Sequence, residues 1–194
     1  MILDAAIHSL ISVIFALLLL WASLHKFSDR LQFQGILAAY QLLPVASLPL
    51  LALFIPVVEL SLGLAWLTGF QNEVVALATV ALLASYTFAM GINIFRGNTE
   101  IDCGCGLSSA RHKTAGYQRL SSSLLLRNLI LILAASIALI PSNERLLGFI
   151  DYLNVGLASV GLVFLYAAFN QLLANKNVID SWRKELVSSG EANG

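Results

Sequence analysis

Apolar and polar stretches alternate five times along the 194 residues of this chain. Each apolar stretch approaches the ~20 residues that a helix needs to cross a ~30 Å hydrocarbon layer. The clearest stretch, VVALATVALLASYTFAMGINIF at 74–95, contains no charged side chain. The pattern predicts membrane-spanning helices over residues 5–24, 45–70, 74–95, 124–140 and 155–174. We therefore expect an all-α integral membrane bundle with four core transmembrane helices and a fifth after them.

The connection between the first two predicted spans has a helical pattern of its own. Apolar side chains recur there at helical spacing, which favours a short helix at the membrane interface or re-entering the protein: Phe33, Ile36, Leu37, Tyr40 and Leu43. Pro44 should end this helix, whereas Pro49 and Pro56 should kink the second span unless neighbours satisfy the freed carbonyls. The short turn at 68–73 predicts that the second and third spans are antiparallel neighbours.

Composition supports a membrane protein and excludes a water-soluble domain of ordinary composition. Hydrophobic side chains make up 58% of the chain, charged ones 11%, and the mean hydropathy is +0.82. Eleven basic and eleven acidic residues cancel, so the net charge indicates no nucleic-acid partner. The first span lacks a basic start and a small-residue cleavage site, so we expect it to be retained. We expect a bundle over 1–175 and a polar tail over 176–194.

The basic residues predict an orientation. With five spans, one arrangement places ten of the eleven Lys and Arg residues on one side, with Arg145 alone opposite. The positive-inside rule then predicts a cytoplasmic C-terminus and a cytoplasmic loop between the third and fourth spans. In either orientation, one face carries the ends of the first and third spans and the starts of the second and fourth. Candidate site residues can meet there: His25, Lys26, Asp102, Cys103, Cys105, His112 and Arg127.

Both cysteines of the chain lie one residue apart in TEIDCGCGLSS, at 99–109. Two virtual bonds of ~3.8 Å separate their Cα atoms, so a local bend can bring them to the ~5.5 Å that a disulfide prefers. Gly104 between them permits such a bend. A strained, exposed disulfide exchanges readily, and five basic residues against two acidic ones over 96–127 favour the thiolate. We predict that Cys103 and Cys105 form a catalytic dithiol/disulfide couple, in which either could attack.

Two alternatives for the cysteines remain open. They could be two free thiols in a loop, although such thiols gain nothing from packing. They could also bind a metal, with His112 as a third ligand and Asp102 or His25 as a fourth. The spacing is not that of a zinc finger, and structural zinc sites usually show paired Cys-x-x-Cys elements, so we predict no metal site.

Glu59 lies about fourteen residues, or ~21 Å, into the second span, near the middle of the membrane. We expect its carboxyl to be protonated or paired with Asn93 or Asn128. It could carry protons, bind a substrate, or hydrogen-bond two helices together. Arg127 and Lys26 could be flanking charges that snorkel to the interface.

Five motifs in order resemble those of the methylamine utilisation protein MauE family, part of the wider DoxX-like group: HKFSD, AAYQLLP, PVVEL, DCGCG and LLLRNLILIL. The resemblance covers roughly residues 14–140. Its most specific element is Asp-Cys-Gly-Cys followed about twenty residues later by Leu-x-Arg-Asn. It gives added weight to Lys26, Glu59, Arg127 and Asn128, since each falls on a family motif.

The resemblance implies an accessory role in the maturation of methylamine dehydrogenase, whose small subunit contains many disulfides, together with a thioredoxin-like partner. It also implies a multi-pass protein of the inner membrane. Disulfide chemistry on an exported enzyme is expected outside the cytoplasm, whereas the basic residues predict a cytoplasmic loop. The side of the membrane therefore stays open.

The combined prediction is a membrane thiol–disulfide exchange protein, whose status as an enzyme the sequence leaves open. His112 with its basic neighbours would favour the thiolate, and Glu59 with Asn128 would form an internal polar site. By analogy with membrane disulfide-forming enzymes, that site could serve protons or a quinone headgroup. One alternative is a non-catalytic assembly factor that recruits a thioredoxin-like partner. Another is a metal or small-solute carrier with a Cys/Cys/His site.

Overall fold

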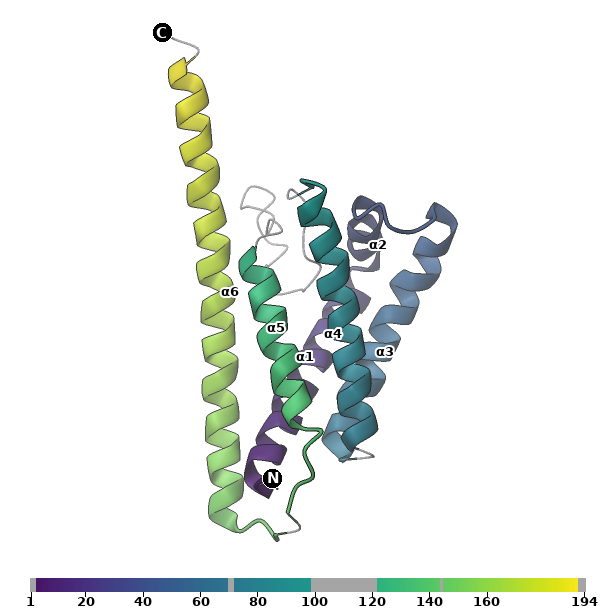
Figure 1. Cartoon of the computed structure of the whole chain (residues 1–194), viewed down its shortest axis with the longest axis vertical. Coiled ribbons are helices and arrows are strands. Elements are labelled where there is room, and N and C mark those ends of the chain that lie inside the picture. Colours follow the sequence, from purple (N-terminus) through teal and green to yellow (C-terminus); the bar gives the residue numbers. More distant parts are fainter. Residues whose placement is uncertain (1–2, 70–71, 99–121, 144, 192–194) are drawn as a thin grey trace.

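The computed structural model describes residues 3–69, 72–98, 122–143 and 145–191. The elements in these ranges are helices, which confirms the predicted all-α fold (Figure 1). Their bounds are Ala5–Ser28 (α1), Arg30–Ala39 (α2), Val45–Ser47 (a 3₁₀ turn, η1), Leu48–Thr68 (α3), Asn72–Phe95 (α4), Ser122–Ile137 (α5) and Phe149–Glu191 (α6).

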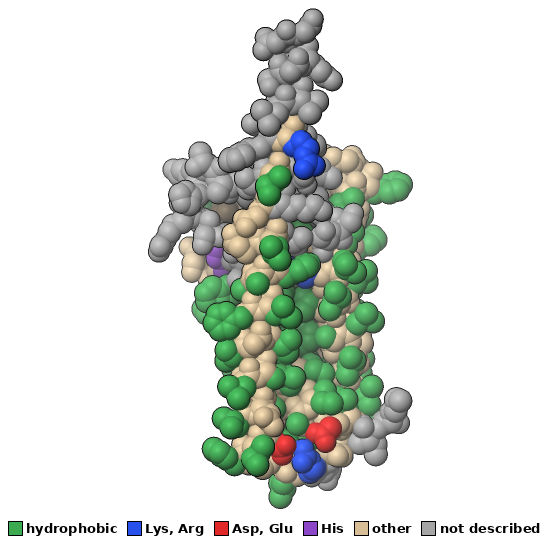
Figure 2. All heavy atoms as spheres, turned by 90° about the vertical axis from the view of Figure 1, so that its left-hand side faces the viewer, with side chains coloured by type: hydrophobic (Ala, Val, Ile, Leu, Met, Phe, Trp, Pro, Cys, Tyr) green, Lys and Arg blue, Asp and Glu red, His purple; other side chains and the backbone are tan. Residues whose placement is uncertain are grey.

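Four of the described helical segments are long and apolar enough to cross a membrane: Ala5–Ser28, Val45–Thr68, Glu73–Phe95 and Phe149–Leu172. A fifth apolar segment, Leu124–Ile137 in α5, is shorter. These are the five segments that the hydrophobic pattern predicts, and the chain is a multi-pass membrane protein. On the face shown in Figure 2, hydrophobic side chains are the main side chains over the middle of the bundle, and most of the charged ones lie nearer its ends.

α5 ends before the predicted limit of its span at residue 140. After Ile137 the backbone tightens, because Ala138, Leu139 and Ile140 each donate to the carbonyl three residues earlier, at 3.1–3.2 Å. Such i→i+3 bonds often close the end of a helix. Pro141, which has no N–H to donate, follows directly. The short α5 therefore has a local cause in the sequence.

α1 and α3 pack closely along much of their length. Ser23 on α1 donates its hydroxyl proton to the carbonyl oxygen of Pro56 at 2.9 Å. A Cβ built on Gly63 would lie 2.9 Å from the Leu20 Cγ, so the glycine permits the close approach. Phe15 stacks on Trp66 with ring centroids 5.6 Å apart. This core fixes the register between the two helices that carry Lys26 and Glu59.

The predicted interfacial helix is present as α2, which confirms this part of the fold. Asp29 caps it by accepting from the Gln32 N–H at 3.2 Å. The helix ends at Ala39, earlier than Pro44, because Gln41 adopts a positive φ of 51°. Pro49 falls in the first turn of α3, where a missing N–H costs nothing, so only Pro56 lies in the helix interior.

The end of the bundle opposite α2 is closed by a small charged cluster. Arg145 contacts Asp4 before α1 and Asp151 in the first turn of α6, each at 3.3 Å. The strand-like bridge between Leu3 and Ser142 lies beside it. From there α6 runs the length of the bundle and continues past its other end (Figure 1). The helix crosses residues 175 and 176 without a break, and the domain boundary there stays a prediction.

Candidate functional site

Three helices bring a buried carboxylate, an ammonium and a phenol together. Lys26 on α1 donates to Glu59 Oε1 on α3, and the Tyr86 hydroxyl on α4 donates to the same oxygen at 2.8 Å. Lys26 and Glu59 are only 5% and 1% exposed. The Lys26 Nζ also lies 5.3 Å from the ring centre of Phe33 and 5.2 Å from that of Tyr86. We call Lys26, Glu59 and Tyr86 the ion-pair cluster.

The ion-pair cluster explains how a carboxylate is tolerated inside this bundle. Glu59 lies eleven residues into α3, about 16 Å from its start at 1.5 Å per residue. Lys26 lies two residues before the end of α1, and its flexible side chain reaches inward. A buried charge is tolerated when an opposite charge and hydrogen bonds compensate it. Lys26 does not snorkel away from the bundle.

The expected partners of Glu59 were Asn93 and Asn128, and the observed partners are different. An ammonium offsets the charge of a carboxylate, which a neutral amide cannot do. Asn93 instead donates its amide to the Ala89 carbonyl, one turn earlier on α4, at 3.1 Å. Tyr86 was missed from the sequence, although it lies in the charge-free span at 74–95, where a phenol hydroxyl requires a partner.

A second polar group forms around Arg127 on α5. Its Nη1 donates to Asn170 Oδ1 on α6 at 2.9 Å, and its Nη2 lies 3.4 Å from Asn128 Oδ1. The guanidinium also lies 5.8 Å from the ring centre of Tyr166. Arg127 is only 4% exposed, so it is a buried residue rather than a snorkelling one. Asn170 was missed, although an amide within an apolar span is a signal for such a contact.

A cavity of about 300 Å³ joins the two polar groups. Residues of α1, α3, α4, α5 and α6 contribute to its lining, which is mainly hydrocarbon. Its polar residues are Lys26, Glu59, Tyr86, Arg127, Asn128 and Tyr166. Four residues that the sequence analysis selected on three different helices therefore line one internal space: Lys26, Glu59, Arg127 and Asn128.

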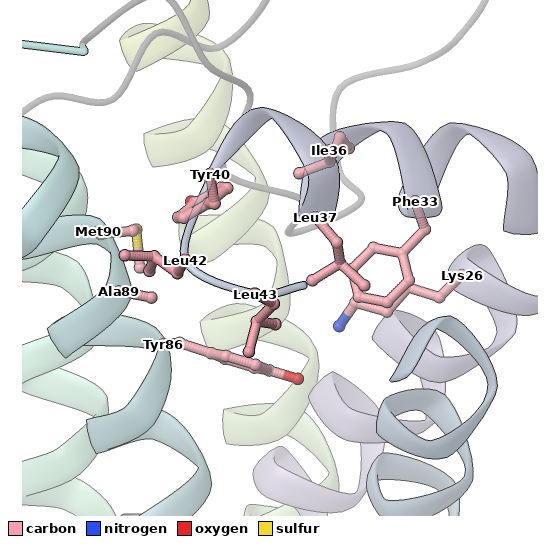
Figure 3. Close-up of a pocket in the computed structure, with 10 residues that line it drawn as sticks. All are labelled: Lys26, Phe33, Ile36, Leu37, Tyr40, Leu42, Leu43, Tyr86, Ala89 and Met90. Atoms are coloured by element: carbon pink, nitrogen blue, oxygen red, sulfur yellow. The ribbon is translucent and has the colours of Figure 1, made fainter. Parts of the chain in front are cut away.

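A smaller cavity of about 90 Å³ lies beneath α2 (Figure 3). The predicted apolar face of α2 and the following loop line it, with Leu43 pointing toward Tyr86 of α4 and Phe33 beside Lys26. Lys26 and Tyr86 line this cavity as well as the larger one. The ion-pair cluster thus lies between the interior of the bundle and the end covered by α2.

The predicted cysteine couple lies outside the described residues, as do Asp102 and His112. The described part of α4 and its turn ends at residue 98, and α5 begins at Ser122, at the end of the bundle that carries α2 (Figure 1). Within the described ranges, no three His, Cys, Asp or Glu side chains gather in a way that could hold a metal ion. The alternative ligand set of Cys103, Cys105 and His112 is not among them.

These features define a class: a small multi-pass helical membrane protein with a buried polar site inside the bundle. The family model described as "Methylamine utilisation protein MauE" matches residues 4–141. The chain therefore belongs to the MauE family of methylamine utilisation proteins.

Curated relatives agree with this assignment. The chain is 35% identical to methylamine utilization protein MauE of Paracoccus denitrificans over 65% of this chain and 65% of that protein, a little under two thirds of its length. It is 30% identical to MauE of Methylophilus methylotrophus over 68% of this chain and 70% of that relative. It is also 30% identical to MauE of Paracoccus versutus over 86% of this chain and 85% of that protein. No solved structure matches the chain.

Proposed function

We propose that this chain is a thiol–disulfide exchange protein of the inner membrane, with Cys103 and Cys105 as its redox couple. Its role would be accessory to disulfide formation in an exported enzyme such as methylamine dehydrogenase. The observation that carries the proposal is the placement of the only two cysteines, one residue apart. Their segment joins α4 to α5, the helix that carries the buried Arg127.

The proposed step is an exchange with a thioredoxin-like partner. The thiolate of one cysteine attacks the partner's disulfide and forms a mixed disulfide, and one partner sulfur leaves as a thiolate. The second cysteine then attacks the mixed disulfide. The products are a Cys103–Cys105 disulfide and a partner dithiol, so two electrons pass to the partner. In the reverse direction the couple oxidises a dithiol, which is the direction that client disulfide formation requires.

An internal polar site supports a functional role for the bundle. Glu59 accepts a hydrogen bond from Tyr86 there, and both residues line one cavity. Arg127 lies five residues after the start of α5, the helix that follows the cysteine segment in the chain. Lys26, Glu59, Arg127 and Asn128 all fall on motifs shared with the family, and all line one cavity.

The proposal is tested by replacing each cysteine separately in a strain that depends on this chain. Cys103→Ser and Cys105→Ser should each abolish disulfide formation in the client enzyme, because a lone thiol cannot cycle. One of the two should also trap a mixed disulfide with the partner, detected on a non-reducing gel. Ser108→Ala, in the same segment, is the matched control and should leave client disulfides intact.

The same experiment separates the alternatives. If both cysteine variants sustain client disulfides while deletion of the whole chain abolishes them, the protein is a non-catalytic assembly factor that recruits the partner. Stoichiometric zinc or copper on the purified protein, lost in a His112→Ala variant, would instead support a metal carrier.

A further inference from the structure

We propose that the cavity of about 300 Å³ binds the ring of a lipid-soluble quinone. This inference deepens the proposed function, because a quinone is the class of oxidant that a membrane dithiol could use. The quinone proposal depends on the proposed function only for the direction in which electrons flow. The binding site itself is argued from residues of the bundle alone.

The lining of the cavity indicates that a ligand would enter from the bilayer. Leu17 and Trp21 of α1 and Val163 of α6 line it, yet they are 44%, 58% and 38% exposed on the lipid-facing surface. A side chain that is both part of the lining and exposed marks the mouth of a cavity. The mouth therefore opens between α1 and α6 toward hydrocarbon. A ligand with an apolar tail can leave the tail there while its head enters.

Two residues that line the cavity each carry a buried polar atom that needs a partner. Glu59 Oε2 and Asn128 Nδ2 have no hydrogen-bond partner among the described residues, although these residues are only 1% and 2% exposed. Both residues line the cavity. An unsatisfied buried polar atom is unfavourable, so a ligand that satisfies both atoms gains affinity.

The two atoms specify the chemistry of the head. Asn128 Nδ2 is a hydrogen-bond donor, which suits a ring carbonyl. Glu59 Oε2 is an acceptor when ionised, which suits a ring hydroxyl. A quinone presents carbonyls, and its two-electron reduced form presents hydroxyls at the same positions. The volume lies at the lower end of the roughly 300–1,000 Å³ of small-molecule pockets, which fits one ring with the start of a chain.

Electrons and protons balance in the proposed reaction between the two thiols and a quinone. Oxidation of the Cys103 and Cys105 thiols forms one S–S bond and releases two electrons and two protons. The quinone takes up both electrons and both protons, and its two carbonyl oxygens become hydroxyls. No other oxidant or reductant is required.

The test is equilibrium binding of ubiquinone-1 to the full-length protein in phosphatidylcholine nanodiscs, followed by quenching of tryptophan fluorescence. Trp21 lines the cavity, so bound quinone should quench it saturably. Ala167→Phe places a phenyl group in the cavity and should weaken binding at least tenfold. The adjacent Ala168, exposed and absent from the lining, provides the matched control: Ala168→Phe should bind like the unchanged protein.

Two further variants separate the head-group contact from the redox function. Asn128→Leu removes the donor at similar size and should weaken binding roughly tenfold. A Cys103→Ser/Cys105→Ser double variant should bind ubiquinone-1 unchanged, so failure of thiol exchange would leave this result intact. Quenching that never saturates, or that Ala167→Phe and Ala168→Phe change equally, overturns the proposal. Phospholipid that fills the cavity and is not displaced by the quinone overturns it too.

Discussion

Single residues in this protein carry charge inside a bundle that is otherwise apolar. Lys26 and Glu59 form a buried salt bridge, and Tyr86 adds a hydrogen bond to the same carboxylate oxygen. Removing one partner from such a pair leaves an uncompensated buried charge, whereas removing both does not. Each residue of the pair therefore affects stability mainly by compensating the charge of the other. The effects of substituting the two residues should depend on each other.

Substitutions at this pair should be strongly non-additive. Lys26→Met alone should lower the free energy of unfolding by about 3–5 kcal/mol, because Glu59 would lose its counter-charge. The double variant Lys26→Met/Glu59→Leu should recover most of that loss. The measurement is reversible unfolding of the purified protein in mixed micelles, with all four members of the double-mutant cycle.

Arg96, an exposed cation near the end of the bundle that carries α2, provides the control for this cycle. Arg96→Met should change the free energy of unfolding by no more than about 0.5 kcal/mol, as is usual for exposed positions. Additive losses in the Lys26/Glu59 cycle would show that the two side chains do not compensate each other and would contradict the observed pairing.

The sequence identifies these residues better than it identifies their contacts. Lys26, Glu59, Arg127 and Asn128 stand out because charged and amide side chains near apolar spans are rare. Their pairing depends on the rotation and register of one helix against another, which residue spacing within a helix does not report. Glu59 was therefore assigned to the amides of Asn93 or Asn128, and the ammonium of Lys26 was overlooked.

At the scale of elements, the close contact between α1 and α3 holds the site together. These helices position Lys26 and Glu59, and Gly63 lets them approach beside Leu20. Small residues at helix interfaces permit such approach in membranes, where packing rather than water exclusion drives association. The site should therefore be sensitive to a single methyl group at this crossing.

Gly63→Ala should destabilise the bundle by about 1–3 kcal/mol, because the added Cβ would overpack against Leu20. Gly91→Ala on α4 is the matched control, since a Cβ there meets no atom within 4 Å. It should be neutral or slightly stabilising, because alanine favours a helix over glycine. Thermal unfolding of both variants in detergent distinguishes them, and equal effects would contradict the packing described for α1 and α3.

Most elements could be predicted because their signals are local. Runs of apolar residues mark the spans, and helical spacing over Phe33 to Leu43 marks α2. Ends of helices were less accurate, since they depend on particular backbone angles such as that of Gln41. The continuation of α6 to Glu191 was not anticipated, because the polar residues after 175 lack the apolar signal that defines the span.

At the scale of the whole molecule, the chain separates two ends of different character. Arg145 and its carboxylate partners close one end, while α2, the start of α5 and the far end of α6 lie at the other (Figure 1). The carboxylates of Asp151 and Asp4 raise the pKa of Arg145, so this arginine remains charged in its cluster. Among the described basic residues, Arg30 on α2 and Arg96 at the end of α4 lie at the opposite end of the bundle (Figure 1).

Which end faces the cytoplasm decides where the proposed electrons come from. The excess of basic residues predicts that the end with α2 is cytoplasmic. Work on an exported client predicts the opposite side.

The most direct measurement is alkylation of Cys103 and Cys105 with a membrane-impermeant maleimide, in intact and in permeabilised cells, before and after treatment with a reductant. The account predicts that both cysteines resist the reagent after mild oxidation, react after reduction, and become resistant again on reoxidation. By the charge rule, labelling should require permeabilised cells. Cysteines that stay fully reactive under every oxidant, or that never react after reduction, would contradict a reversible thiol–disulfide couple.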